Sequence, residues 1–212
     1  MEIGSTGEER MKDILELTKG VKNNPNGKYN GNELDYILEV LDSENMERKS
    51  NPYVNRFEKK FNEVFKSKYS IAHNSGTSTL HSCLVAAGVK PGDEVISPAH
   101  TVIMNSFVTL YMNAVPVYVD IDPYTFNMDP KDLERKITKK TKAILPVDVA
   151  GLSIDIDDFK NFAEEENLIF IEDAAEALGS EYKGKRIGSF NHTSIFSFHM
   201  AKLATTIEGG CI

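Results

Sequence analysis

The sequence has only two cysteines, Cys83 and Cys211, and they lie far apart in the chain. Neither belongs to a close group of cysteines and histidines, so the spacing supports neither a zinc site nor a disulfide framework. We therefore expect no bound metal, and we expect the protein to work in a reducing compartment, the cytoplasm.

Long apolar segments are also missing. Residues 1–10 are rich in acidic residues and lack an apolar core, which excludes a standard secretory signal peptide. No apolar run reaches the length of about 20 residues that crosses a bilayer. We therefore expect no partnership with a membrane.

Positive charge is scarcer than negative charge. The sequence has 24 Lys and Arg residues against 32 Asp and Glu residues, which gives a formal net charge of -8. It contains no stripe of basic residues, and nucleic-acid binding needs a concentrated basic face. We therefore expect no nucleic-acid partner. A small anionic ligand remains compatible with the composition, because local charge can oppose net charge.

Strand and helix patterns alternate along the chain. Short apolar stretches predict strands, and the segments between them have the apolar spacing of helices. Strands that alternate with helices predict an α/β fold, a mainly parallel sheet with helices on both faces. The predicted strands are residues 95–97, 117–120, 143–147, 169–172 and 193–198, and the predicted helices are 32–41, 54–65, 80–87, 103–113, 130–137 and 156–166.

The first part of the chain differs from the rest. Residues 22–27 form a polar cluster that contains two turn formers, Pro25 and Gly27. We interpret residues 1–31 as an N-terminal extension and residues 32–212 as the main domain.

The predicted sheet gives an expectation for the ligand site. Ligands of such sheets collect at the carboxyl ends of the strands. We therefore expect Asp173, the pair Ser97 and Pro98, and Ser197 to face one common cleft.

Residues 74–78 read Asn-Ser-Gly-Thr-Ser, follow a short apolar piece and precede a predicted helix. Backbone N–H groups and hydroxyls at the start of a helix can bind a phosphate. The same residue types are also ordinary helix caps, and the pattern alone does not decide between the two interpretations. The segment matches neither a Walker loop nor a dinucleotide fingerprint.

Asp173 and Lys202 are the candidate catalytic residues. Asp173 ends an apolar stretch, where it could either cap the following segment or meet a cation such as a protonated pyridine nitrogen. Lys202 follows another apolar stretch, close to Ser197 and before Gly209 and Gly210. A solvated surface lysine is the default interpretation, whereas a desolvated lysine can react with a carbonyl group. A phosphate-type turn, a strand-end carboxylate and a lysine in this order are what pyridoxal phosphate requires.

Residues 32–212 resemble the sugar aminotransferases of the DegT/DnrJ/EryC1/StrS group, which are pyridoxal-phosphate enzymes of fold type I. The resemblance implies that these residues are the cofactor-binding large domain, incomplete at its C-terminus, because relatives continue through further strands and a small domain. It is carried by five motifs in the same order, at residues 74–81, 91–96, 116–122, 172–179 and 197–210.

The resemblance also implies roles for individual residues. Lys202 corresponds to the lysine that binds the cofactor covalently and later moves a proton, and Asp173 to the partner of the pyridine nitrogen. Val102 occupies a position where most relatives stack an aromatic ring on the cofactor, and His100 is a candidate substitute or a structural histidine. The other implied cofactor contacts are Gly76, Thr77, Ser78 and Ser197 at the phosphate and Glu176 near the ring oxygen, where relatives often have Gln or His.

The expected function follows from the resemblance. Relatives of this kind transfer an amino group, with glutamate as the expected donor, to a keto group on a nucleotide-activated sugar, and we expect a homodimer when the chain is full length. The sister dehydratases carry histidine at the position of Lys202, which argues against that chemistry. The competing interpretation is a truncated fragment without catalysis, because the chain stops at Ile212.

Overall fold

The computed structural model describes residues 32–42 and 52–212 of the chain. The chain divides into two compact units, Met1–Asn55 and Arg56–Ile212. The predicted N-terminal extension, residues 1–31, lies outside the described residues, so the domain boundary expected at its end stays a prediction.

One seven-stranded sheet forms the centre of the second unit, in the order β1-β9-β8-β5-β4-β2-β3. The pairs from β8 to β3 are parallel, whereas β9 is antiparallel to both of its neighbours. The expected mainly parallel sheet is therefore confirmed. Its strands are β1 (Ala72–His73), β2 (Glu94–Pro98), β3 (Val115–Val119), β4 (Thr141–Ile144), β5 (Ile169–Asp173), β8 (Thr193–Ser197) and β9 (Gly210–Cys211).

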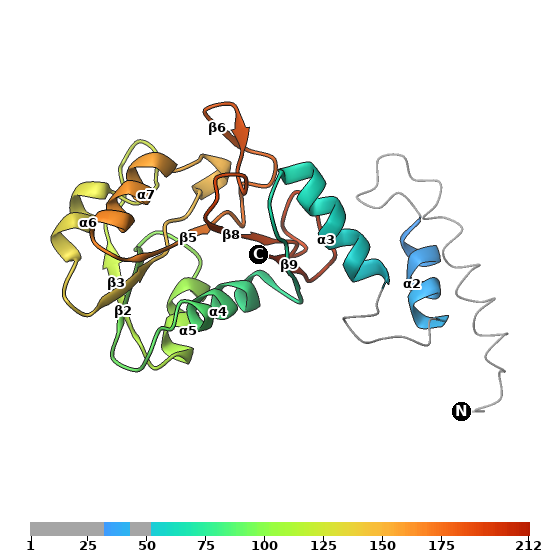
Figure 1. Cartoon of the computed structure of the whole chain (residues 1–212), viewed down its shortest axis with the longest axis horizontal. Coiled ribbons are helices and arrows are strands. Elements are labelled where there is room, and N and C mark those ends of the chain that lie inside the picture. Colours follow the sequence, from blue (N-terminus) through green and yellow to red (C-terminus); the bar gives the residue numbers. More distant parts are fainter. Residues whose placement is uncertain (1–31, 43–51) are drawn as a thin grey trace. The chain divides into compact units, whose positions relative to one another are not determined.

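Helices cover both faces of this sheet. Figure 1 shows α6 and α7 on one side of the strands and α4 and α5 on the other. The predicted helices are present, each within a few residues at its ends. They are α2 (Glu33–Asp42), which belongs to the first unit, and α3 (Pro52–Phe65), α4 (Gly76–Ala86), α5 (Met104–Tyr111), α6 (Pro130–Lys136) and α7 (Ile156–Glu165), with a short 3-10 turn η1 at Val149–Gly151.

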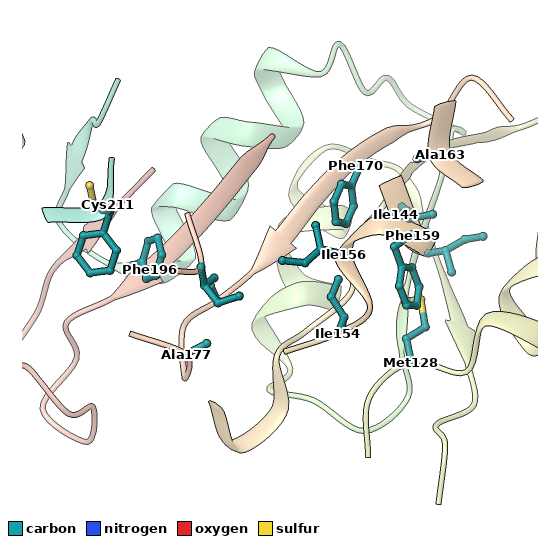
Figure 2. Packing of buried hydrophobic residues seen from close by; sticks show 14 of the residues in the cluster. Met128, Ile144, Ile154, Ile156, Phe159, Ala163, Phe170, Ala177, Phe196 and Cys211 are labelled. Atoms are coloured by element: carbon teal, nitrogen blue, oxygen red, sulfur yellow. The ribbon is translucent and has the colours of Figure 1, made fainter. Parts of the chain in front are cut away.

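Two apolar clusters, one on each face, hold these layers together. Adjacent residues of a strand point to opposite faces, and in β5 Phe170 joins one cluster while Ile171 joins the other. The first cluster packs against α7 through Phe159, which Figure 2 shows beside the strands. The second packs against α4 through Leu84 and against α5 through Val108. Burial on both faces explains why these strands are almost continuously apolar in sequence.

Three short features were not predicted. β1 and β9 contain two residues each, too few for a periodic pattern to show. A two-stranded hairpin, β6 (Glu181–Tyr182) and β7 (Lys185–Arg186), turns at Lys183 and Gly184, which both have positive φ. This is the backbone of a tight primed turn, for which glycine at the second position is a typical signal.

Within the described part of the chain, no helix is long and apolar enough to cross a membrane, and no group of His, Cys, Asp and Glu side chains is arranged to hold a metal ion. Cys83 and Cys211 are both buried and free, and burial raises the pKa of each thiol to about 12. Both thiols are therefore protonated at neutral pH and unsuited to act as nucleophiles.

Candidate cofactor site

A cavity of about 210 Å³ lies at the carboxyl ends of the parallel strands. Its wall comes from the ends of β2, β4, β5 and β8 and the segments that follow them, as expected for an open α/β sheet. We call it the Lys202 cavity. It is lined by His100, Thr101, Val102, Val147, Val149, Asp173, Ala175, Glu176 and Lys202.

Lys202 is held at the cavity wall by a carboxylate. Its backbone N–H donates to the carbonyl of His199 at 2.9 Å, in the segment that follows β8. Its Nζ donates to Oε1 of Glu176 at 3.2 Å, and 24% of the side chain is exposed. A solvated surface lysine is therefore not what the structure contains at this position. The covalent role of Lys202 stays a prediction.

Glu176 is anchored to the backbone on its other side. Its Oε2 accepts the N–H of Ala150 at 2.9 Å. This hydrogen bond, together with the positive charge of Lys202, lowers the pKa of the Glu176 carboxyl. Glu176 is therefore ionised at neutral pH. Ala150 has a φ of 53°, which is uncommon for a residue with a Cβ, so the same bond also stabilises a strained turn.

Asp173 is the last residue of β5, and 1% of it is exposed. Its Oδ1 accepts the N–H of Ala175 at 3.1 Å, so the capping interpretation describes one of its oxygens. Burial raises the pKa of the Asp173 carboxyl, whereas the Ala175 N–H, the Asn105 side chain and the charge of Lys202 lower it. Burying a charge is costly unless it is paired, so this carboxylate suits a cationic partner in the cavity.

Val102 and His100 form the wall after β2. Val102 is 54% exposed and lines the cavity, so an aliphatic side chain stands where the resemblance implies an aromatic ring. The ring of His100 also lines the cavity, and its centroid lies 5.9 Å from that of Phe126. His100 therefore has an aromatic partner in the fold.

Gly76, Thr77 and Ser78 form the first turn of α4, after the N-cap residue Ser75. The Oγ of Ser75 accepts the N–H of Ser78 at 3.1 Å, and the Oγ of Ser78 accepts the N–H of Ser75 at 3.2 Å, which makes a capping box. The cap interpretation is therefore correct for Ser75 and Ser78. The turn also lies at the positive end of the helix dipole, where phosphate can bind, and that role stays a prediction.

Ser197 lies directly against Gly76. A Cβ added to Gly76 would lie 2.9 Å from the Cβ of Ser197 and 3.1 Å from its Oγ. Glycine is therefore required for β8 to approach the start of α4 this closely. Two residues that the resemblance assigns to the phosphate are thus brought together by the fold.

The prediction of one cleft shared by Asp173, the pair Ser97 and Pro98, and Ser197 is wrong in part. Of these four residues, Asp173 alone lines the Lys202 cavity. Ser97 lies inside β2, which continues to Pro98, and is 2% exposed. Ser197 lies under the first turn of α4.

Sequence reasoning missed part of the cavity wall. Val147 is the last residue of the stretch 143–147, and Val149 follows it by two positions. The rule that ligands collect at the carboxyl ends of strands would have indicated both. A second hollow, of about 370 Å³, shares Ala175, Glu176 and Lys202 with the Lys202 cavity. A larger cavity, of about 480 Å³ beside β8, contains none of the predicted site residues and is not part of this site.

Asp148, between Val147 and Val149, is fully buried. Its Oδ1 accepts the N–H of Ile154 at 2.9 Å, whereas its Oδ2 has no hydrogen-bond partner among the described residues. Burial, reinforced by the negative charge of Glu172, raises the pKa of this carboxyl to about 8. Asp148 is therefore mostly neutral at pH 7 in the folded chain.

This raised pKa predicts a pH-dependent stability. Between the ordinary pKa of an aspartate, about 4, and the folded value of about 8, the folded chain binds one more proton at Asp148 than the unfolded chain. Its contribution to stability therefore falls as pH rises, by at most about 1.4 kcal/mol per pH unit, and levels off above pH 8. The free energy of unfolding of Asp148→Asn, measured relative to that of the wild type, should therefore rise progressively between pH 5 and pH 8.

Urea unfolding at intervals across this range measures the effect. Asp157→Asn is the matched control, because Asp157 is exposed and its hydrogen bond with Lys183 lowers the pKa of its carboxyl, which is already ionised at pH 5. A stability difference between Asp148→Asn and the wild type that stays constant with pH would contradict the assignment.

The chain matches a family of aminotransferases and individual members of known sequence. A family model described as the DegT/DnrJ/EryC1/StrS aminotransferase family matches residues 28–212. The GDP-perosamine synthase of Caulobacter vibrioides is 46% identical over 182 residues, which are 86% of this chain and 49% of that protein. The chain therefore spans about half the length of the curated relatives that it matches.

Solved structures agree with the sequence match. A 3-amino-5-hydroxybenzoic acid synthase superposes with a TM-score of 0.82 at 36% identity, covering 86% of this chain and 48% of that one. Spr1654 of Streptococcus pneumoniae in its PLP form superposes with a TM-score of 0.79 at 34% identity, covering 84% of this chain and 48% of that one. The same protein has been solved in a PMP form.

Proposed function

Since the chain belongs to the DegT/DnrJ/EryC1/StrS aminotransferase family, which depends on pyridoxal phosphate, we propose that it is the cofactor-binding half of a sugar aminotransferase. The proposed reaction transfers an amino group from glutamate to a keto group on a nucleotide-linked sugar. The name GDP-perosamine synthase supports a nucleotide-linked sugar as the substrate class. Because the chain spans about half of such a relative, the reaction is proposed for the chain together with a carboxyl-terminal half.

One observation carries the proposal. Lys202 and the buried carboxyl of Asp173 line the same cavity. Burial raises the pKa of the Asp173 carboxyl, and the positive charge of Lys202 opposes that rise. Pyridoxal phosphate needs an amine for its carbonyl carbon and an anion for its protonated ring nitrogen. The close approach of Gly76 and Ser197 at the start of a helix suits its phosphate. The residues present therefore fit this cofactor.

When bound, the cofactor supplies an electron sink for the carbanion that transamination forms. In the proposed division of roles, Lys202 binds the carbonyl carbon and later moves a proton, and Asp173 keeps the ring nitrogen protonated. Glu176 orients the Lys202 amine through the bond at 3.2 Å. The remaining contacts are Val102 on the ring and Gly76, Thr77, Ser78 and Ser197 at the phosphate.

The form of the enzyme is also part of the proposal. We expect a homodimer in the cytoplasm once a carboxyl-terminal half is present. A dehydratase of the same family is the weaker alternative, because the resemblance places histidine at the position of Lys202 in those enzymes. A form that binds cofactor without catalysis is the other alternative.

Reduction with borohydride tests the cofactor site directly. The chain is incubated with pyridoxal phosphate, reduced, digested and mapped by mass spectrometry. We expect the pyridoxyl group on Lys202, because that amine lines the cavity. Lys183 is the natural comparison, since its side chain is 63% exposed and pairs with Asp157 outside the cavity.

Lys202→Arg serves as the control, because it keeps a positive charge beside Glu176 but cannot bind the cofactor covalently. This variant should lose the label. Label on Lys183 or Lys185, or no label on any lysine, would contradict the proposed site.

A further inference from the structure

Asn105, in the first turns of α5, has a side chain that the fold itself does not explain. It is fully buried, yet neither its Nδ2 nor its Oδ1 has a hydrogen-bond partner of good geometry among the described residues. An unsatisfied buried polar group destabilises a fold, because it loses its hydrogen bonds to water without replacing them. Such groups are rare in folded proteins. Asn105 lies behind the wall of the Lys202 cavity, because its backbone N–H donates to the carbonyl of the lining residue Val102 at 3.4 Å.

The neighbours of Asn105 on the same helix are satisfied. Ser106 accepts the hydroxyl of Tyr118 at 3.0 Å, and the hydroxyl of Thr109 donates to the backbone carbonyl of Asn105 at 2.9 Å. Polar side chains in this helix are therefore not left unpaired in general. The unpaired amide is specific to Asn105.

Asp173 is the carboxyl on which this amide acts. Burial raises the pKa of the Asp173 carboxyl, whereas hydrogen bonding by the N–H of Ala175 and by the Asn105 side chain lowers it. The charged neighbours Lys202 and Glu176 act on the same carboxyl with opposite signs, Lys202 lowering its pKa and Glu176 raising it. The two hydrogen-bonding groups thus come from two elements, the turn after β5 and the helix α5.

We propose that Asn105 is a positioning residue, whose amide donates to Asp173 and, with the N–H of Ala175, fixes the carboxylate toward the ring nitrogen of pyridoxal phosphate. This inference rests on the proposed function. A single backbone donor leaves a carboxylate free to rotate about its last bond, and a second donor removes that freedom. Hydrogen bonds in active sites are often poorly aligned until the ligand is present, which fits the geometry of Asn105.

The experiment compares Asn105→Ala with the wild type in the chain loaded with pyridoxal phosphate. A hydrogen bond to a charged group accounts for about a tenfold or greater change in affinity. We therefore expect the dissociation constant of the cofactor to rise about tenfold. We also expect a rise in the pH at which the bound cofactor changes its visible absorption. When the ring nitrogen is less fully protonated, its positive charge repels the protonated nitrogen of the lysine adduct less, so the pKa of the adduct nitrogen rises.

The stability of the chain without added cofactor separates positioning from structure. Removing an unsatisfied buried amide should leave the urea midpoint unchanged or raise it. Ser106→Ala is the matched control, since it lies beside Asn105 in α5 and should change neither the affinity for cofactor nor the absorption. Asn105→Ser keeps a shorter donor and should restore part of the affinity.

The outcomes are distinguishable. If the wild type binds pyridoxal phosphate and Asn105→Ala behaves identically, the positioning role is wrong while the proposed function stands. If Asn105→Ala fails to fold, Asn105 is a structural residue and the inference is overturned. If the wild type binds no cofactor, the proposed function falls and this inference falls with it.

Discussion

Asp173→Asn is expected to lower the turnover number by about 10²–10³-fold, the range typical of removing one electrostatic contact that stabilises a transition state. Asparagine keeps the shape of the side chain and an oxygen that can accept the N–H of Ala175. It removes the negative charge that would keep the ring nitrogen protonated. Affinity for pyridoxal phosphate should therefore change far less than turnover.

The measurement requires the chain joined to the carboxyl-terminal half of a relative, with glutamate and a nucleotide-linked keto-sugar as substrates. Asp157→Asn is the control, because Asp157 lies on α7 and pairs with Lys183 at 2.7 Å, outside the Lys202 cavity. Its turnover should match that of the wild type. A turnover of Asp173→Asn close to normal would remove Asp173 from the mechanism.

Gly210→Ala is expected to destabilise the chain by about 3 kcal/mol, the upper part of the usual range for overpacking. A Cβ on Gly210 would lie 2.4 Å from the carbonyl oxygen of Ser75 and 2.7 Å from its carbonyl carbon. Both atoms belong to the backbone and cannot rotate away. The first turn of α4 would have to shift, so binding of pyridoxal phosphate should weaken as well.

Urea unfolding and cofactor titration check this expectation. Gly88→Ala is the comparison, because Gly88 has a φ of +70° and nothing within 4 Å of an added Cβ. It should cost about 1–2 kcal/mol through backbone strain alone and leave cofactor binding unchanged. If both variants lost the same stability and bound cofactor equally, the contact between Gly210 and Ser75 would have no special importance.

The sequence predicts the layers of the fold better than the details of the site. Strands such as β5 are four or more residues long and buried on both faces, so their composition alone identifies them. One cavity does bring together Lys202, Asp173, Glu176 and Val102. This could be predicted, because the rule that ligand sites lie at the carboxyl ends of parallel strands needs only the order of the strands.

The remaining features depend on contacts between distant segments. β1 and β9 are recognisable only by their pairing in the sheet, β1 with β9 and β9 also with β8. Asn105 and Asp148 are polar residues whose burial comes from packing of α5 and of the segment after β4, which no local pattern shows. Ser97 is polar at a strand end, yet the strand continues past it and removes it from the cavity.

The position of β9 between β8 and β1 has a consequence for the order in which the protein is built. β1 has β9 as its sheet neighbour, through the registers Ala72 to Cys211 and His73 to Gly210. During synthesis the early strand must therefore wait until nearly the whole described chain has been made, and closing so large a loop is slow. Ser75, whose carbonyl packs on Gly210, likewise reaches its final packing only after Gly210 has been made. The start of α4 is thus completed only after Lys202 has been made, so the proposed phosphate turn and the lysine become available at nearly the same stage of synthesis.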